Sequence, residues 1–177
     1  MMRFVSTGLN PAVLIELEAV FDERGFFART WSSDEFRARD LNAALVQCSL
    51  SFNKRKGTLR GLHFQKVPHA EAKLVRCTGG EIYDVIVDLR SDSPTFKQWF
   101  GTHLSSDNRR SLYVPEGFAH GFITLTDEAE VFYQISEPYS PAAAAGVRWD
   151  DPAFGIDWPI PVTVISERDA NYPDFIS

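Results

Sequence analysis

The sequence has few of the features that mark secreted, membrane or nucleic-acid-binding proteins. Only two cysteines occur, Cys48 and Cys77, which is too few for a disulfide framework and fits a reducing compartment. No apolar run approaches the roughly 20 residues of a membrane span, and the N-terminus lacks an apolar block followed by a cleavage site. Basic residues are not in excess, because the net charge is −6, which excludes broad attraction to nucleic-acid phosphates. We therefore expect a cytoplasmic protein with no nucleic-acid or membrane partner.

The composition that remains favours β-structure. Aromatic residues make up 13% of the chain and include 14 phenylalanines, and such residues suit the half-buried surface of a sheet. Many short β-rich runs are separated by turn residues, with no alternation of strands and helices. The pattern predicts one all-β domain over residues 1–177, a jelly-roll barrel with one or two short helices. From about Pro138 the chain is rich in Pro, Asp and Trp, which predicts an ordered C-terminal strap across the barrel.

Three local features sharpen this prediction. A capping box at Ser32 to Glu35 predicts a short helix that ends near Asn42, with Phe36 and Leu41 facing the core. The pair Gly79-Gly80 predicts a tight hairpin. The run 83–89 places Asp84 and Asp88 on the same face as Ile86, so each acid lies either at a strand end or in a polar cavity.

Two of the four histidines stand out by their neighbours. In the strand Arg60-Gly61-Leu62-His63-Phe64-Gln65, strict alternation puts His63 on the same face as Gly61 and on the face opposite to Arg60. The glycine leaves room for a close approach beside His63. His120 follows a turn that contains Pro115 and Gly117. These two segments resemble the paired motifs of the cupin superfamily, which is built on a jelly-roll barrel. That superfamily's metal site needs a second histidine where this chain has Gln65, and Glu71 is out of step, so we expect no metal.

The chain also carries a more specific set of strings, in order and across nearly its whole length. They are Asp22-Glu23-Arg24-Gly25-Phe26-Phe27, Leu59-Arg60-Gly61-Leu62-His63, Lys73-Leu74-Val75-Arg76, Pro115-Glu116-Gly117-Phe118-Ala119-His120-Gly121-Phe122 and Arg148-Trp149-Asp150-Asp151-Pro152. Together they closely resemble the dTDP-4-dehydrorhamnose 3,5-epimerase family. The resemblance implies an isomerase that needs no cofactor and moves protons at C3 and C5 of a nucleotide-linked 4-keto-6-deoxyhexose, the carbons that flank the C4 ketone.

Such chemistry needs a base, an oxyanion stabiliser and an acid. The resemblance implies that His63 is the base, that Asp169 supports its imidazole, that Lys73 stabilises the oxyanion and that Tyr133 is the acid. An imidazole titrates near neutrality and a phenol keeps its proton at pH 7, so both residue types suit their roles. Outside this context the same residues could be a core tyrosine, a solvated lysine and a loop acid.

The resemblance also implies a set of substrate-binding residues. Arg24 and Arg60 offer forked donors to a diphosphate. Phe27 could stack on the nucleobase or belong to the core. Three further predicted binding residues match family positions near the pocket: Gln47, Asp84 and His120.

The chain departs from the family pattern at positions that affect recognition and leaves the proposed catalytic groups intact. Cys48-Ser49 replaces an Asp-Asn pair, Arg29 replaces a glutamate, and the strap reads Pro141-Ala142-Ala143-Ala144-Ala145 where a glutamate is common. Three alternatives therefore stay open: an epimerase acting at C3 or C5 alone or on another nucleotide, a non-catalytic sugar-binding cupin, and a metal-dependent cupin. The resemblance further implies a homodimer with strands shared between subunits.

Overall fold

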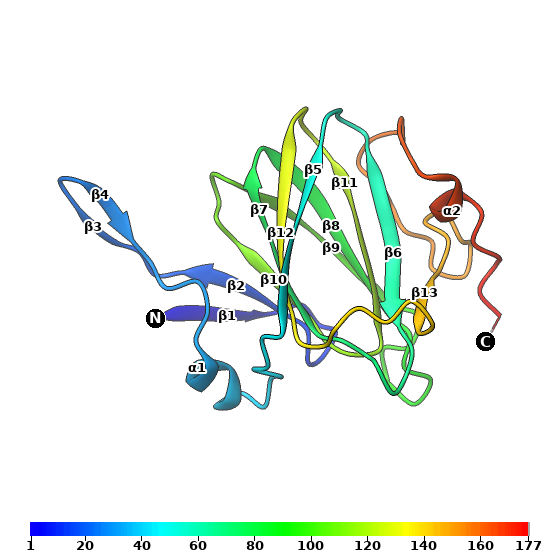
Figure 1. Ribbon diagram of the computed structural model, residues 1–177, viewed down its shortest axis with the longest axis horizontal. Helices are drawn as coiled ribbons and strands as arrows, with labels where there is room; N and C mark the ends of the chain where they lie inside the picture. The colour runs from blue at the N-terminus through cyan, green and yellow to red at the C-terminus, as the bar shows by residue number, and fades with distance from the viewer. Residues whose placement is uncertain (177) are drawn as a thin grey trace.

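The computed structural model, which describes residues 1–176, consists of two antiparallel β-sheets with a hairpin projecting from one end (Figure 1). One sheet has six strands in the order β1 (Met2–Ser6), β2 (Val13–Leu17), β10 (Ser111–Val114), β7 (Lys73–Gly79), β12 (Ala129–Ile135) and β5 (Gln47–Asn53). The other has five strands in the order β13 (Ala144–Gly146), β6 (Leu59–Gln65), β11 (Phe118–Thr124), β8 (Glu81–Asp88) and β9 (Trp99–Ser105). The predicted all-β, jelly-roll architecture is confirmed, although the two sheets do not join into a closed barrel within residues 1–176.

The main core lies between the two sheets. Val75 and Val131 from the six-stranded sheet pack with Ile82, Ile86 and Phe122 from the five-stranded sheet, and all five are at most 1% exposed. Each such side chain contributes roughly 1.5–3 kcal/mol when it is buried. The period-2 alternation of the strands places these residues on the inner faces, and this core holds the two halves of the site described below at a fixed separation.

Asp84 and Asp88 of strand β8 are both buried. Asp88 lies at the end of the strand, where its carboxylate accepts hydrogen bonds from Arg90, Ser93 and Thr95 at 2.5–2.9 Å. Burial alone would raise the pKa of Asp88, but these donors lower it to about 2. Asp84 points between the sheets, where its carboxylate bonds to His120, and so does not lie at a strand end.

The predicted helix is present but shorter than expected. Helix α1 spans Ser33–Arg37, and the side chain of Ser32 makes no capping hydrogen bond, so the predicted capping box is wrong. The helix ends early because Asp40 adopts a positive φ of 57° and the N–H of Leu41 turns back to the Phe36 carbonyl. Phe36 and Leu41 are buried, as predicted.

The predicted Gly79-Gly80 hairpin is also wrong, because β7 and β8 lie in different sheets. The turn carries the chain from one sheet to the other. Gly80 adopts a φ of 70° there, and a side chain at this position would collide with Thr126.

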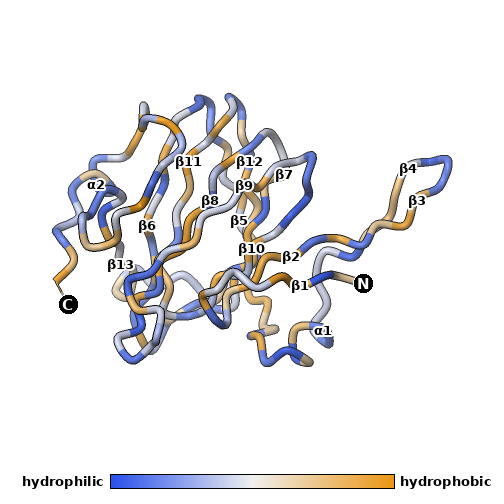
Figure 2. Tube along the Cα trace, turned by 180° about the vertical axis from the view of Figure 1, so that it is seen from behind, coloured by the Kyte–Doolittle hydropathy of each residue, from blue (hydrophilic) through white to orange (hydrophobic). Residues whose placement is uncertain are grey.

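Two segments lie outside the sandwich. The hairpin of β3 (Val20–Asp22) and β4 (Gly25–Phe27) extends away from it and carries hydrophobic strands with a hydrophilic tip (Figure 2). The C-terminal strap is ordered, as predicted, and includes β13 and helix α2 (Glu167–Ala170). Its Phe154 and Trp158 pack on Leu62 and Val85 of the five-stranded sheet. No helix among residues 1–176 is long and apolar enough to cross a membrane.

Candidate active site

A cavity of about 710 Å³ opens between strands of the two sheets and is bordered by the segment that leads into α2. Strands β5 and β12 contribute from one sheet, and β6 and β11 from the other. The cavity is lined by all four predicted catalytic residues and by two of the predicted binding residues: His63, Lys73, Tyr133, Asp169, Arg60 and His120. The structure thus brings together side chains that are up to 109 positions apart in the chain, from Arg60 to Asp169.

The two histidines lie side by side because their strands approach closely. His120 of β11 is paired with His63 of β6, so both side chains point to the same face of the sheet. Gly61 has a φ of 132°, and a Cβ there would lie 2.5 Å from the Cα of Gly121, so only glycine fits this contact. The close approach that the sequence predicted beside His63 is therefore made by β11.

The same contact corrects a prediction about Arg60. Strict alternation puts Arg60 and His63 on opposite faces of β6, but both line the cavity. The register between β6 and β11 shifts between His120 and Phe122, and such an irregularity turns a side chain to the other face.

His63 and Asp169 form a hydrogen-bonded pair. The distance from His63 Nε2 to Asp169 Oδ1 is 2.8 Å, and Asp169 Oδ2 accepts a hydrogen bond from the Gly61 N–H at 3.1 Å. Because an ionised carboxylate only accepts, it places the ring proton on Nε2 and leaves the lone pair on Nδ1. Burial would raise the pKa of Asp169, but the hydrogen bond from His63 and the backbone N–H of Gly61 lower it overall, so the group stays ionised.

Two contacts of the C-terminal segment position Asp169 beside His63. The Thr58–Val164 bridge ties the C-terminal segment to the start of β6. Ser166 then caps α2 by accepting a hydrogen bond from the Asp169 N–H at 3.1 Å. The side chain of Asp169 is 7% exposed, and this helical turn fixes it against His63.

Lys73 lies at the start of β7, with its ammonium group largely buried. Its Nζ lies 2.8 Å from Glu71 Oε1 and 3.4 Å from the carbonyl oxygen of His63. The Lys73 side chain is 12% exposed. An ammonium group has three donors, so these two contacts leave one for a ligand.

Tyr133 approaches the cavity from β12, in the sheet opposite His63. Its ring packs against the main core and lies edge-on to His120, with 6.2 Å between the ring centroids. Burial raises the pKa of the Tyr133 phenol, and the nearby charge of Asp84 raises it further. The phenol therefore keeps its proton throughout the physiological range.

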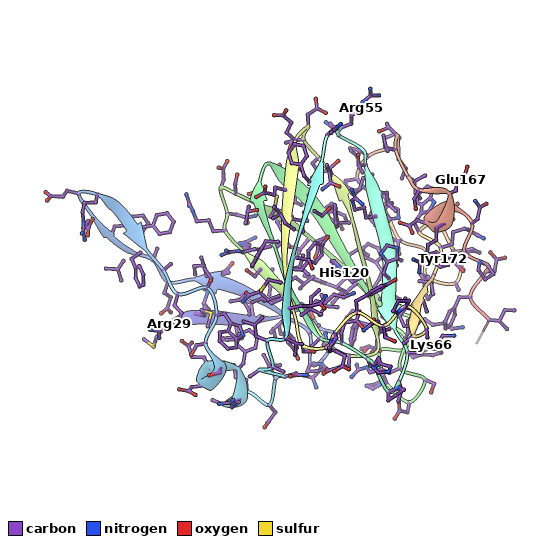
Figure 3. All side chains as sticks on the ribbon, in the orientation of Figure 1. Arg29, Arg55, Lys66, His120, Glu167 and Tyr172 are labelled. Atoms are coloured by element: carbon purple, nitrogen blue, oxygen red, sulfur yellow. The ribbon has the colours of Figure 1, made fainter. Side chains whose placement is uncertain are left out.

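His120, which lies between the sheets (Figure 3), forms a second pair with Asp84. The distance from His120 Nε2 to Asp84 Oδ1 is 2.8 Å, and the two side chains are 4% and 0% exposed. His120 lines the cavity but Asp84 does not. Asp84 therefore reaches the cavity only through His120, and its role in substrate binding stays a prediction.

A smaller cavity of about 220 Å³ continues the site towards the strap. It shares His63, Lys73 and Arg168 with the first cavity and adds Gln47 and Tyr139. Gln47 Oε1 accepts a hydrogen bond from the Tyr139 N–H at 3.2 Å. Within residues 1–176 no three His, Cys, Asp or Glu side chains are grouped to hold a metal ion.

Comparison with known proteins decides which family this site belongs to. The family model described as dTDP-4-dehydrorhamnose 3,5-epimerase matches residues 6–177. The epimerase of that name from Methanothermobacter thermautotrophicus is 47% identical over 173 residues, which cover 96% of this chain and 92% of the relative. The chain belongs to the dTDP-4-dehydrorhamnose 3,5-epimerase family. As a member of this family it is an isomerase.

Solved structures agree with this epimerase in fold. The Bacillus anthracis epimerase with TDP and PPi bound has a TM-score of 0.94 and 43% identity, and covers 99% of this chain and 100% of its own. A Legionella pneumophila epimerase in complex with dTDP-4-keto-L-rhamnose has a TM-score of 0.89 and 37% identity, over 96% and 90%. A 3′-monoepimerase from Streptomyces bikiniensis in complex with dTDP-quinovose has a TM-score of 0.88 and 30% identity, over 96% and 86%.

Two predicted binding residues lie away from the cavity of this epimerase. Arg24 and Phe27 belong to the projecting hairpin, where Arg24 pairs with Asp22 at 2.5 Å and Phe27 is 75% exposed. Arg29 lies on the same side of the molecule, opposite Tyr172 (Figure 3). Within one chain the structure does not bring Arg24 or Phe27 to the site.

Arg168 and Glu71 line the cavities of this epimerase but were not among the predicted site residues. Arg168 borders both cavities, and its position directly before Asp169 was the signal that could have indicated it. Glu71 borders the smaller cavity and was considered only as a metal ligand. Glu71 and Lys73 are two residues apart, and side chains at that spacing share a face only within a strand. Because Glu71 precedes strand β7, the spacing did not predict the Glu71–Lys73 ion pair.

Proposed function

We propose that this protein epimerises dTDP-4-dehydro-6-deoxy-D-glucose at C3 and C5 to give dTDP-4-dehydro-L-rhamnose, without a cofactor. The observation that carries the proposal is the meeting of the His63–Asp169 pair, the Lys73 ammonium and the Tyr133 phenol in one cavity. These are the base, the cation and the acid that proton transfer next to a ketone requires.

In the first step His63 Nδ1 removes the proton from a carbon next to the C4 ketone. Asp169 accepts from Nε2–H, which keeps Nδ1 free to take the proton and stabilises the imidazolium that forms. The electron pair moves onto the ketone oxygen and gives an enolate. The Lys73 ammonium stabilises this oxyanion with the donor that Glu71 and His63 leave unused.

In the second step Tyr133 returns a proton to the same carbon from the other side. His63 belongs to the five-stranded sheet and Tyr133 to the six-stranded sheet, so a sugar between the sheets has the base on one face and the acid on the other. Delivery to the opposite face inverts the carbon. The raised pKa of the phenol means that it is protonated when the enolate forms.

The nucleoside diphosphate is placed by the cationic and amide groups along the cleft. Arg60 lines the main cavity, and Arg168 lies where the two cavities join. Arg60 Nε is held by Asn53 Oδ1 at 2.7 Å, which orients its guanidinium. His120 lies deeper and Gln47 lies towards the strap, so the cleft offers donors along its length.

We further propose a homodimer in which the hairpin of one subunit completes the site of the other. The hairpin exposes Val20, Phe21 and Phe27 at 70–75%, which is costly for strands surrounded by water. Leu50 and Phe52 of edge strand β5 are also more than half exposed, and Leu50 lines the main cavity. A partner that covers these surfaces would bring Arg24 and Phe27 to the nucleotide, which one chain alone does not do.

An epimerase that acts at one carbon is the second candidate function, because the S. bikiniensis 3′-monoepimerase shares the fold at 30% identity. The test is to incubate the protein with dTDP-4-dehydro-6-deoxy-D-glucose in D2O and follow the product by NMR. Deuterium at both C3 and C5 supports the double epimerisation, and deuterium at C3 alone supports the second candidate. If neither C3 nor C5 takes up deuterium, both epimerase functions are refuted and the non-catalytic sugar-binding cupin is the alternative that stays.

The remaining predictions concern the setting of the protein. A cytoplasmic location is supported by Cys48 and Cys77, which are both free thiols. The proposal of one epimerase-like domain over residues 1–177 is supported by the strap, which returns to pack on the five-stranded sheet.

A further inference from the structure

Glu71 is a buried carboxylate that the proposed reaction does not use directly. It lies in the loop between β6 and β7, two residues before Lys73, and is 8% exposed. Burying an ionised carboxylate is unfavourable unless both of its oxygens find partners. In this protein both do, and the partners belong to the active site.

Each oxygen of Glu71 has a distinct partner. Oε2 accepts a hydrogen bond from the backbone N–H of Gln65 at 2.9 Å, at the end of β6. Oε1 lies 2.8 Å from Lys73 Nζ. The first contact anchors the carboxylate to the strand that carries His63, and the second uses this anchor to hold the ammonium.

We propose that Glu71 is a positioning residue, which fixes the Lys73 ammonium beside the His63 strand so that its free donor meets the ketone oxygen. The proposal rests on the role of Lys73 in the proposed function. A lysine side chain has four rotatable carbon–carbon bonds, so a carbonyl contact of 3.4 Å alone would not hold its end in one place. Glu71 restricts the ammonium to the wall that the two cavities share.

Gln65, which holds Glu71 through its backbone N–H, is itself hydrogen-bonded to the strap. Gln65, whose N–H holds Glu71, uses its side-chain Nε2 to donate to the Pro138 carbonyl at 3.2 Å. Its Oε1 accepts from the Ser140 N–H at 2.6 Å. The start of the strap, the end of β6 and the Lys73 ammonium therefore form one connected set of hydrogen bonds.

The primary test is Glu71→Met, which keeps the length of the side chain but removes both acceptor oxygens. We expect kcat on dTDP-4-dehydro-6-deoxy-D-glucose to fall about 10- to 100-fold, because small displacements of a catalytic group cost that much. The Kd for dTDP, measured by calorimetry, should change less than about 3-fold. Glu71→Gln should lose less kcat than Glu71→Met, since its one amide oxygen can still accept from the Lys73 ammonium, while its NH2 group then faces the Gln65 N–H and the anchor to β6 is lost.

A double-mutant cycle separates positioning from general damage to the fold. If Glu71 acts through Lys73, then adding Glu71→Met to Lys73→Met should change kcat less than about 2-fold. If instead the kcat of the double variant falls by the product of the two single-variant losses, the proposal is overturned. If Glu71→Met does not fold, Glu71→Ala takes its place in the same cycle.

A second readout does not depend on turnover. Acylation of Lys73 by an amine-directed reagent, followed by mass spectrometry, should be at least about 3-fold faster in Glu71→Met, because the ammonium is released from its ion pair. Glu81→Gln is the matched control: it removes a carboxylate from the exposed Glu81–His103 pair and should leave the labelling of Lys73 unchanged.

The two readouts distinguish failure of this inference from failure of the proposed function. Unchanged labelling of Lys73 in Glu71→Met would refute the positioning role whatever the activity. Faster labelling in a protein that epimerises no substrate would support the hold of Glu71 on Lys73 and refute the proposed reaction.

Discussion

Replacing Asp169 by Asn tests the His63–Asp169 pair without removing a side chain. The amide has one oxygen and one NH2 group, where the carboxylate has two oxygens. If the oxygen accepts from the Gly61 N–H, as Asp169 Oδ2 does at 3.1 Å, the NH2 group faces His63 Nε2. The imidazole must then accept at Nε2 and carry its proton on Nδ1, where it can no longer act as the base.

The expected loss follows from the contact that is removed. A hydrogen bond to a charged partner contributes about 1.5–3 kcal/mol, and each 1.36 kcal/mol changes a rate about 10-fold. Asp169→Asn should therefore lower kcat roughly 10- to 150-fold through the lost stabilisation of the imidazolium, and further through the wrong tautomer. The Kd for dTDP should change little, because Asp169 faces His63 and is only 7% exposed.

Turnover is followed by NMR at saturating substrate, and folding is checked by thermal unfolding. Asp150→Asn is the matched control, since Asp150 pairs with Arg148 on the surface and does not line the cavities. A variant Asp169→Asn with the kcat of the wild type would refute the assignment of His63 as a carboxylate-supported base.

Three further predictions use other parts of the structure. Tyr133→Phe should lower epimerisation by about 10²-fold or more, while His63 still exchanges deuterium into recovered substrate without inversion, which NMR in D2O can detect. Because the pKa of Asp88 is lowered from 3.8 to about 2, its ionisation contributes about 2 kcal/mol above pH 4 that is lost as the pH falls towards 2. In urea unfolding, Asp88→Asn should therefore be less stable than the wild type at pH 7, and this difference should shrink at pH 2.5. Phe21→Asp, at a position 74% exposed in one chain, should shift the mass seen by analytical ultracentrifugation from dimer to monomer; an unchanged dimer would contradict the hairpin exchange.

The fold was predictable from the sequence where local pattern decides the structure. Alternating apolar residues, an aromatic-rich composition and frequent turns indicated the strands, and the apolar residues of the strap indicated that it is ordered. The prediction failed where partners distant in sequence decide. Gly79-Gly80 has the residues of a tight hairpin, but the flanking strands pair with β12 and β9, not with each other.

The residues of the candidate site were likewise predictable only in part. Family strings indicated His63, Lys73, Tyr133 and Asp169, and the structure brings them to one cavity. Alternation misplaced Arg60, because the irregular pairing of β6 with β11 depends on the contact between Gly61 and Gly121, which no local pattern shows. Local pattern also did not show that Asp84 lies behind His120, because this contact joins strands β8 and β11 at residues 36 positions apart.

The carboxylate that bonds to His63 lies 106 positions after it, on a four-residue helix. Bringing such distant positions together carries an entropic cost that is recovered only when the segment that carries Asp169 docks. The segment that carries Asp169 forms part of the cavity wall and is tied to β6 through the Thr58–Val164 bridge. A chain whose two sheets have folded while this segment is undocked would therefore hold an incomplete cleft.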